Sequence, residues 1–193
     1  MIFLSATCQA LLAFVLAVAC ASKTRGRASF AGFTDAVVAL GRVPRPWAIW
    51  AAAGIVALEG VTVPALLVPG WGSAGLSVAA VLLTGFTYVV ARAVRDGSAV
   101  ACRCFGGSGD HAPGRAQLVR NAVLLVAVVV AAPGVPGAGS LSWQGWFAAW
   151  LIGAVCAVVV VTGDEVAALL RPSRRAPAPA SAAAPTARPH EAI

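Results

Sequence analysis

Five long apolar runs, each almost free of charged residues, constrain this chain more than any other feature. The runs cover residues 2–22, 46–67, 73–91, 118–132 and 143–162. A helix needs roughly 20 apolar residues to cross the hydrocarbon of a bilayer, because each residue advances it by about 1.5 Å. Only helices and closed barrels satisfy their backbone hydrogen bonds in lipid. The runs therefore predict an all-α fold, a polytopic transmembrane helical bundle with about five spans.

The composition excludes a soluble globular domain. Hydrophobic residues make up 60% of the chain and charged residues only 11%, whereas a soluble domain carries about 25% charged residues to hydrate its surface. The net charge of +7 comes from basic residues at the ends of the apolar runs. They form no stripe with interleaved aromatic residues, so we expect the lipid bilayer as a partner and no nucleic acid.

The basic residues predict the topology. All 14 of them lie in the segments 22–45 and 92–120 or in the C-terminal tail. Because Lys and Arg are retained on the cytoplasmic side, we expect the N-terminus outside and the C-terminus cytoplasmic, in a multi-pass protein of the plasma membrane. The first run lacks a basic n-region, which favours a retained span over a cleaved signal peptide.

The chain divides into two parts. Residues 1–165 are predicted to form the transmembrane bundle. Residues 166–193 are rich in Pro and Ala with few large apolar side chains, so we predict a disordered cytoplasmic tail.

Two cysteines, Cys102 and Cys104, lie one residue apart in the loop after the third run. Arg103 between them favours the reactive thiolate form of either sulfur. A disulfide between such close cysteines closes a small, strained ring, which makes it more oxidising. The alternatives are thiols without a role or half of a metal site, for which only His111 lies near as a third ligand. We favour a redox pair and assign no metal.

The other cysteines lie in predicted spans. Cys8 and Cys20 are in the first run and Cys156 is in the fifth. A lone cysteine in a membrane helix is usually a small packing residue, and we interpret all three in that way.

Charged and polar residues inside the spans are further candidates. Glu59 interrupts the second run, and it is either functional or hydrogen-bonded to a group such as Ser77 or Thr84 for packing. Arg120 and Asn121 open the fourth run, where the arginine either extends to lipid phosphates or stabilises a thiolate. Lys23 closes the first run and has the same two interpretations, of which we favour extension to the interface.

Several segments together resemble the methylamine utilisation protein MauE family, membrane relatives of the DoxX-type proteins, over residues 12–132. The resemblance is carried by Ala19-Cys20-Ala21-Ser22-Lys23, by Phe30 and Phe33, by Ala57-Leu58-Glu59-Gly60, by Cys102-Arg103-Cys104-Phe105-Gly106, and by Gly114-Arg115 with Leu118-Val119-Arg120-Asn121.

The resemblance implies a DoxX-like core of four helices, with a fifth helix added, in a redox-associated membrane protein. MauE works with a thioredoxin-like partner to mature the disulfide-rich small subunit of methylamine dehydrogenase. By this likeness Cys102 and Cys104 exchange electrons, while Glu59, Arg120 and Asn121 are supporting polar residues. Arg103 departs from the family, in which a small residue often stands between the cysteines.

Three functions follow as hypotheses. The first is an integral membrane thiol–disulfide redox component that supports maturation of an exported, disulfide-rich client. The second is a non-catalytic scaffold or chaperone for a partner enzyme. The third is a quinone-linked or small-molecule carrier that uses Glu59. We predict no bound cofactor, and a quinone is the one candidate.

Overall fold

The computed structural model describes residues 1–68, 70–96, 115–134 and 141–170, and these are all helical or in short connections. Cys102, Arg103 and Cys104 lie outside the described residues, as does nearly all of the predicted tail. The helices in chain order are α1 (Ile2–Thr24), α2 (Arg27–Gly41), α3 (Arg45–Leu67), α4 (Gly72–Arg95), α5 (Arg115–Ala131) and α6 (Trp143–Leu170). The predicted all-α fold is confirmed for this part of the chain.

Five of these helices are long and apolar enough to cross a membrane, as predicted. The candidate spans are Ile2–Thr24, Arg45–Leu67, Gly72–Arg95, Ala116–Gly134 and Trp143–Gly163. The fourth reaches a spanning length by taking in residues on both sides of the apolar run. Helix α6 continues to Leu170, so it takes in the first residues of the tail that was expected to begin at residue 166.

Large apolar side chains cover the outer faces of the spans. Trp50 is 73% exposed, Val129 is 71% exposed and Val155 is 64% exposed. A soluble protein would aggregate through such a surface, whereas in a bilayer these side chains contact lipid tails. The exposure pattern therefore agrees with a multi-pass membrane protein.

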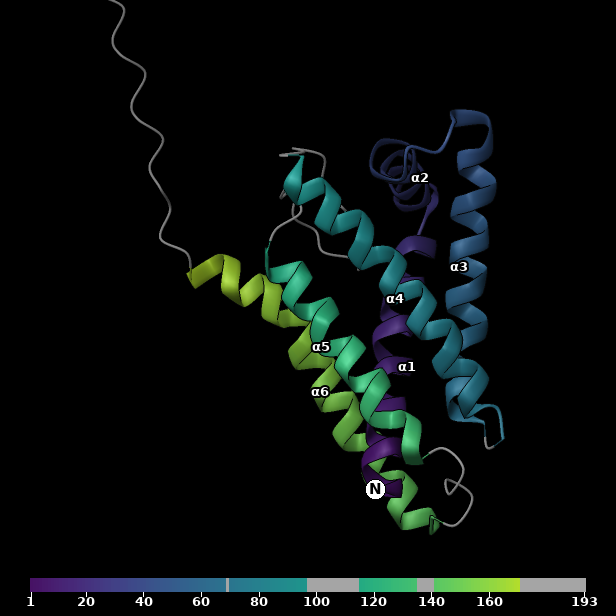
Figure 1. Ribbon diagram of the computed structural model, residues 1–193, viewed down its shortest axis with the longest axis vertical. Helices are drawn as coiled ribbons and strands as arrows, with labels where there is room; N and C mark the ends of the chain where they lie inside the picture. Colours follow the sequence, from purple (N-terminus) through teal and green to yellow (C-terminus); the bar gives the residue numbers. More distant parts are fainter. Residues whose placement is uncertain (69, 97–114, 135–140, 171–193) are drawn as a thin grey trace, which may run out of the picture.

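Helix α1 lies at the centre of the bundle (Figure 1). It packs against each of the five other helices, most extensively against α6 and α3. Its apolar residues Leu12, Val15 and Leu16 are each 1% exposed, and they form the main core together with residues of α4 and α5. Helices α6 and α3 are thus held mainly through α1, and α5 through both α1 and α4, whereas α4 packs mainly on α3 and α5, and α2 packs mainly on α3.

Helix α2 is the one described helix that is not a candidate span. Its residues Phe33 and Val37 pack on Ala48 and Ala52, which lie in the first half of α3. In Figure 1 it is seen nearly end-on, beside the upper part of α3 and beyond the C-terminal end of α1. This helix therefore covers the end of α1 that carries Lys23.

A tight turn joins α3 to α4. The Trp71 amide donates to the Val68 carbonyl at 3.2 Å, and Gly70 has a φ of +88°, which glycine adopts without a steric penalty. The turn makes α3 and α4 an antiparallel pair.

Small residues let the helices approach closely. A Cβ placed on Gly153 of α6 would lie 2.9 Å from the Leu11 amide nitrogen of α1 and 2.6 Å from the Ala10 Cβ. Such contacts between small residues replace the hydrophobic driving force, which is absent between helices in lipid. Gly153 is therefore the residue that fixes the close contact of α6 with α1.

Polar groups hold α5 against α1. The Ser5 hydroxyl donates to the Ala131 carbonyl at 2.5 Å, and the Gln9 amide donates to Ser5 at 3.1 Å. The contact joins the N-terminal end of α1 to the C-terminal end of α5. These two helices are therefore antiparallel, and the beginning of α5 lies toward the Lys23 end of α1.

We predict that Gly153→Ala destabilises the protein by about 1–3 kcal/mol, because the added methyl group overlaps the α1 backbone. Gly163→Ala in the same helix is the matched control, since nothing lies within 4 Å of its added Cβ. The control should be neutral or slightly stabilising, because alanine favours a helix over glycine. Thermal unfolding of both variants in detergent measures the difference, and equal midpoints would contradict the packing described here.

Candidate functional site

The most unusual feature inside the bundle is a buried ion pair between α1 and α3. The Lys23 ammonium lies 2.5 Å from Oε1 of Glu59, and the two side chains are 1% and 0% exposed. Ionised groups at such a depth are costly unless they are paired, and paired ones are candidates for function. The expectation that Lys23 extends to the interface is therefore wrong, because its ammonium points into the bundle.

Two helices that cross the site supply aromatic rings. The Lys23 Nζ lies 4.9 Å from the ring centre of Phe33 on α2 and 5.1 Å from that of Phe86 on α4. Ring faces attract a cation, and the attraction is stronger where water is excluded. We call Lys23, Glu59, Phe33 and Phe86 the ion-pair site. It joins four helices at one point.

The ion pair uses only one of the two carboxylate oxygens of Glu59. Oε2 of Glu59 is buried and has no hydrogen-bond partner among the described residues. Ser77, one of the packing partners expected for this carboxylate, instead donates to the Ser73 carbonyl at 2.9 Å. The observed partner of Glu59 is Lys23. Glu59 therefore accepts from Lys23 and keeps a second acceptor oxygen inside the bundle.

Cys20 lies next to this pair along α1. Its sulfur is 3.8 Å from the Val56 carbonyl oxygen, and a Cβ on Gly60 would lie 3.8 Å from the same sulfur. The absence of a side chain on Gly60 lets α1 and α3 meet beside Glu59. Cys20 is half-buried there and fills space at the helix contact, in line with the packing role expected for it.

The structure also describes the other two cysteines of the predicted spans. Cys8 of α1 and Cys156 of α6 are partly buried, and both pack against the main hydrophobic core. Their surroundings agree with small packing residues as well.

The beginning of α5 carries the remaining predicted polar residues. Asn121 is 1% exposed, and its Oδ1 atom has no hydrogen-bond partner among the described residues. Arg120 is half-buried. Because α5 is antiparallel to α1, both residues lie toward the Lys23 end of the bundle. Asn121 adds a buried polar side chain there to those of Lys23 and Glu59.

Cys102 and Cys104 lie outside the described residues, in the chain that joins the end of α4 to the beginning of α5. Within the described ranges no three His, Cys, Asp or Glu side chains gather in a way that would hold a metal ion. The site that the structure does describe is therefore one of charge and aromatic rings.

Sequence reasoning identified Glu59 but missed its partner. A signal was present, since Lys23 lies in the last turn of the first span and Glu59 lies inside the second, and their charges are opposite. A charge inside a membrane bundle is stabilised most by an opposite charge on a neighbouring helix. That rule would have matched Lys23 with Glu59.

We predict that Lys23→Met and Glu59→Gln each lower stability by about 3–5 kcal/mol, because each leaves the other group buried without its partner. The combined variant should be more stable than the sum of the two losses implies. Chemical unfolding of the purified protein measures all three. Arg25→Gln is the control, since this arginine is exposed and lies two residues after Lys23. Strict additivity of the two losses would show that the groups do not act as a pair.

A comparison with protein families gives one clear match. The family model of methylamine utilisation protein MauE matches residues 1–134, which include α1 to α5 and the Cys102-Arg103-Cys104 segment. Helix α6 lies beyond the match. No curated protein and no solved structure matches the chain. Since the match covers more than half of the sequence, the chain belongs to the methylamine utilisation protein MauE family.

Proposed function

We propose that this membrane protein is a thiol–disulfide redox component that supports maturation of an exported, disulfide-rich client in methylamine utilisation. The observation that carries the proposal is the Cys102-Arg103-Cys104-Phe105-Gly106 segment, which lies inside the part of the chain matched by the family. Family membership supports a membrane protein of methylamine utilisation, and the cysteine pair supplies the redox chemistry. The proposed location is the plasma membrane.

The chemistry is disulfide exchange. A thiolate of the client attacks one sulfur of the Cys102–Cys104 disulfide, which forms a mixed disulfide and releases the other cysteine as a thiolate. The second thiolate of the client then displaces the first cysteine. The client gains a disulfide, and Cys102 and Cys104 are left as a dithiol that holds the two electrons.

The dithiol must then be oxidised again by a partner. A thioredoxin-like protein in its disulfide form accepts the two electrons by the same exchange, and two protons accompany them. A quinone that is reduced to a quinol is the alternative acceptor. Arg103 assists either route, because a neighbouring positive charge stabilises the thiolate that attacks.

The ion-pair site supports this proposal because it helps to hold the helices from which the cysteine segment extends. The chain that carries the two cysteines begins at the end of α4 and ends at the start of α5. Phe86 of α4 contacts Lys23, and α5 is held against α1 by Ser5. Pairing of Lys23 with Glu59 fixes α1 against α3, so the helices on either side of the cysteine segment keep a defined position.

We predict that Cys102 and Cys104 change together from alkylatable thiols to a protected disulfide when membranes are treated with a thiol oxidant. Mass spectrometry after differential alkylation measures the change. Cys156, which packs in the bundle on α6, is the internal control and should keep one state throughout. Uniform alkylation of both cysteines under oxidant, in folded protein, would contradict the redox role.

A genetic comparison separates this role from that of a scaffold. Cys102→Ser with Cys104→Ser should abolish disulfide formation in the client while the protein still accumulates in the membrane. Cys156→Ser is the matched control and should leave client maturation intact. A scaffold would give full maturation with the double variant, and its partner enzyme would still co-purify.

A further inference from the structure

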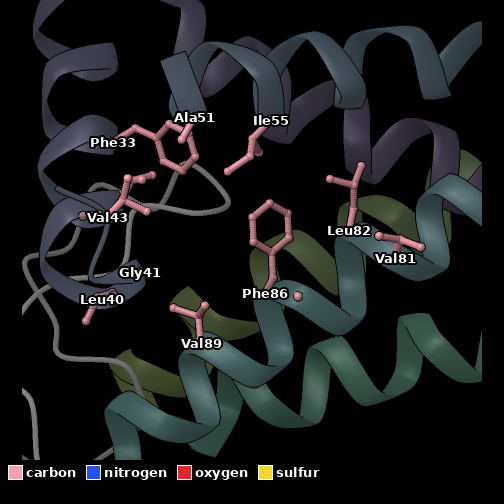
Figure 2. Close-up of a pocket in the computed structure, with 13 residues that line it drawn as sticks. Phe33, Leu40, Gly41, Val43, Ala51, Ile55, Val81, Leu82, Phe86 and Val89 are labelled. Carbon is pink, nitrogen blue, oxygen red and sulfur yellow. The ribbon is translucent and has the colours of Figure 1, made fainter. Parts of the chain in front are cut away.

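An apolar groove of about 260 Å³ lies between α2, α3 and α4. Figure 2 shows the side chains of Phe33, Ile55 and Phe86 pointing toward one another across it. The described residues that line it are all apolar or glycine: Phe33, Ala36, Val37, Leu40, Gly41, Val43, Ala51, Ile55, Val81, Leu82, Gly85, Phe86 and Val89. The lining therefore suits a hydrocarbon group, since the described residues offer no side chain that donates a hydrogen bond.

The groove runs lengthwise along α4. Val81, Gly85 and Val89 are spaced by four residues and so lie on one face of the helix. From Val81 to Val89 the groove extends about 12 Å at roughly 1.5 Å per residue. One end is formed by Gly41, the last residue of α2, and by Val43, in the connection between α2 and α3. This shape suits an extended chain that enters at the end of the bundle and points toward the middle of α4.

Positive charge lies at that end of the groove. Arg42 stands between the two lining residues Gly41 and Val43, and its side chain is 68% exposed. One guanidinium nitrogen lies 3.8 Å from a carboxylate oxygen of Asp96, and Arg92 lies 3.7 Å from the same oxygen. Two arginines therefore share one acid, and the mouth of the groove has a net positive charge. Exposed pairs of this kind are weak, so an anion can compete for the arginines.

We propose that this groove binds an anionic phospholipid, with one acyl chain between α2 and α4 and the phosphate at Arg42 and Arg92. Guanidinium groups bind phosphate oxygens through paired, charge-assisted hydrogen bonds. The apolar lining accepts the chain and offers nothing to the carbonyl groups of a quinone. The charge at the mouth and the apolar groove beneath it thus match the two parts of a single lipid.

The lipid also supports the ion-pair site. Phe33 and Phe86 line the groove and are the same rings that lie over the Lys23 ammonium. An acyl chain behind the rings holds them in place and keeps water from the pair. The lipid therefore acts as a structural ligand that links α2 to α4.

Filling the groove tests the acyl-chain part of the proposal. Gly85 lines the groove and an added Cβ meets nothing within 4 Å, so Gly85→Leu directs a side chain into the groove from a position with room for its Cβ. Gly54→Leu is the matched control, because Gly54 is also free of neighbours within 4 Å and does not line the groove. Native mass spectrometry of the full chain, titrated with phosphatidylglycerol, should show that Gly85→Leu loses the tightest bound lipid and that Gly54→Leu keeps it.

Neutralising the mouth tests the headgroup part. Arg42→Gln should weaken phosphatidylglycerol binding about fivefold, the effect of one arginine near an anionic lipid. Arg25→Gln removes an equal charge between α1 and α2, away from Arg42 at the other end of α2, and should leave this binding unchanged. Wild-type protein should prefer phosphatidylglycerol to phosphatidylcholine. Equal binding of the two lipids, equal binding by both glycine variants, or an isoprenoid quinone as the molecule displaced by Gly85→Leu would each overturn the proposal.

Discussion

The cost of an unpaired charge inside a membrane bundle governs how this protein is built. Lys23 and Glu59 lie on different helices, and neither can be buried without the other. Their pairing fixes α1 against α3, and the rings of Phe33 and Phe86 bring α2 and α4 to the same point. Four of the six described helices therefore converge on one interaction. Helix α6 joins mainly through α1, and α5 joins through both α1 and α4.

Much of the fold could be predicted because lipid leaves few alternatives. Long apolar runs must be helices, so the five spans follow from the sequence, and Gly70 marks the turn between two of them. The close approach at Gly153 could not be predicted, because a glycine in an apolar run carries no information about its neighbour. The position of α2 also could not be predicted from the sequence, because an amphipathic helix can lie on the membrane surface or pack against other helices.

The candidate site was only partly predictable for the same reason. A lysine at the end of an apolar run is ordinarily at the interface, and Lys23 would be there if α1 ended in headgroups. Instead α2 folds over that end and packs on the first half of α3, which encloses the ammonium. Glu59 was identified from its place in a span, whereas its partner depended on tertiary structure. The redox role of Cys102 and Cys104 stays a prediction from sequence and family.

Reversing both charges of the pair tests the central claim most directly. Lys23→Glu and Glu59→Lys should each bury two like charges and sharply reduce the folded protein recovered from membranes, while the combined variant should recover most of it. Size-exclusion chromatography of detergent extracts, with a fluorescent tag, measures the yield of monodisperse protein. If the combined variant yields no more than the poorer single variant, Lys23 and Glu59 do not hold the bundle together by their mutual attraction.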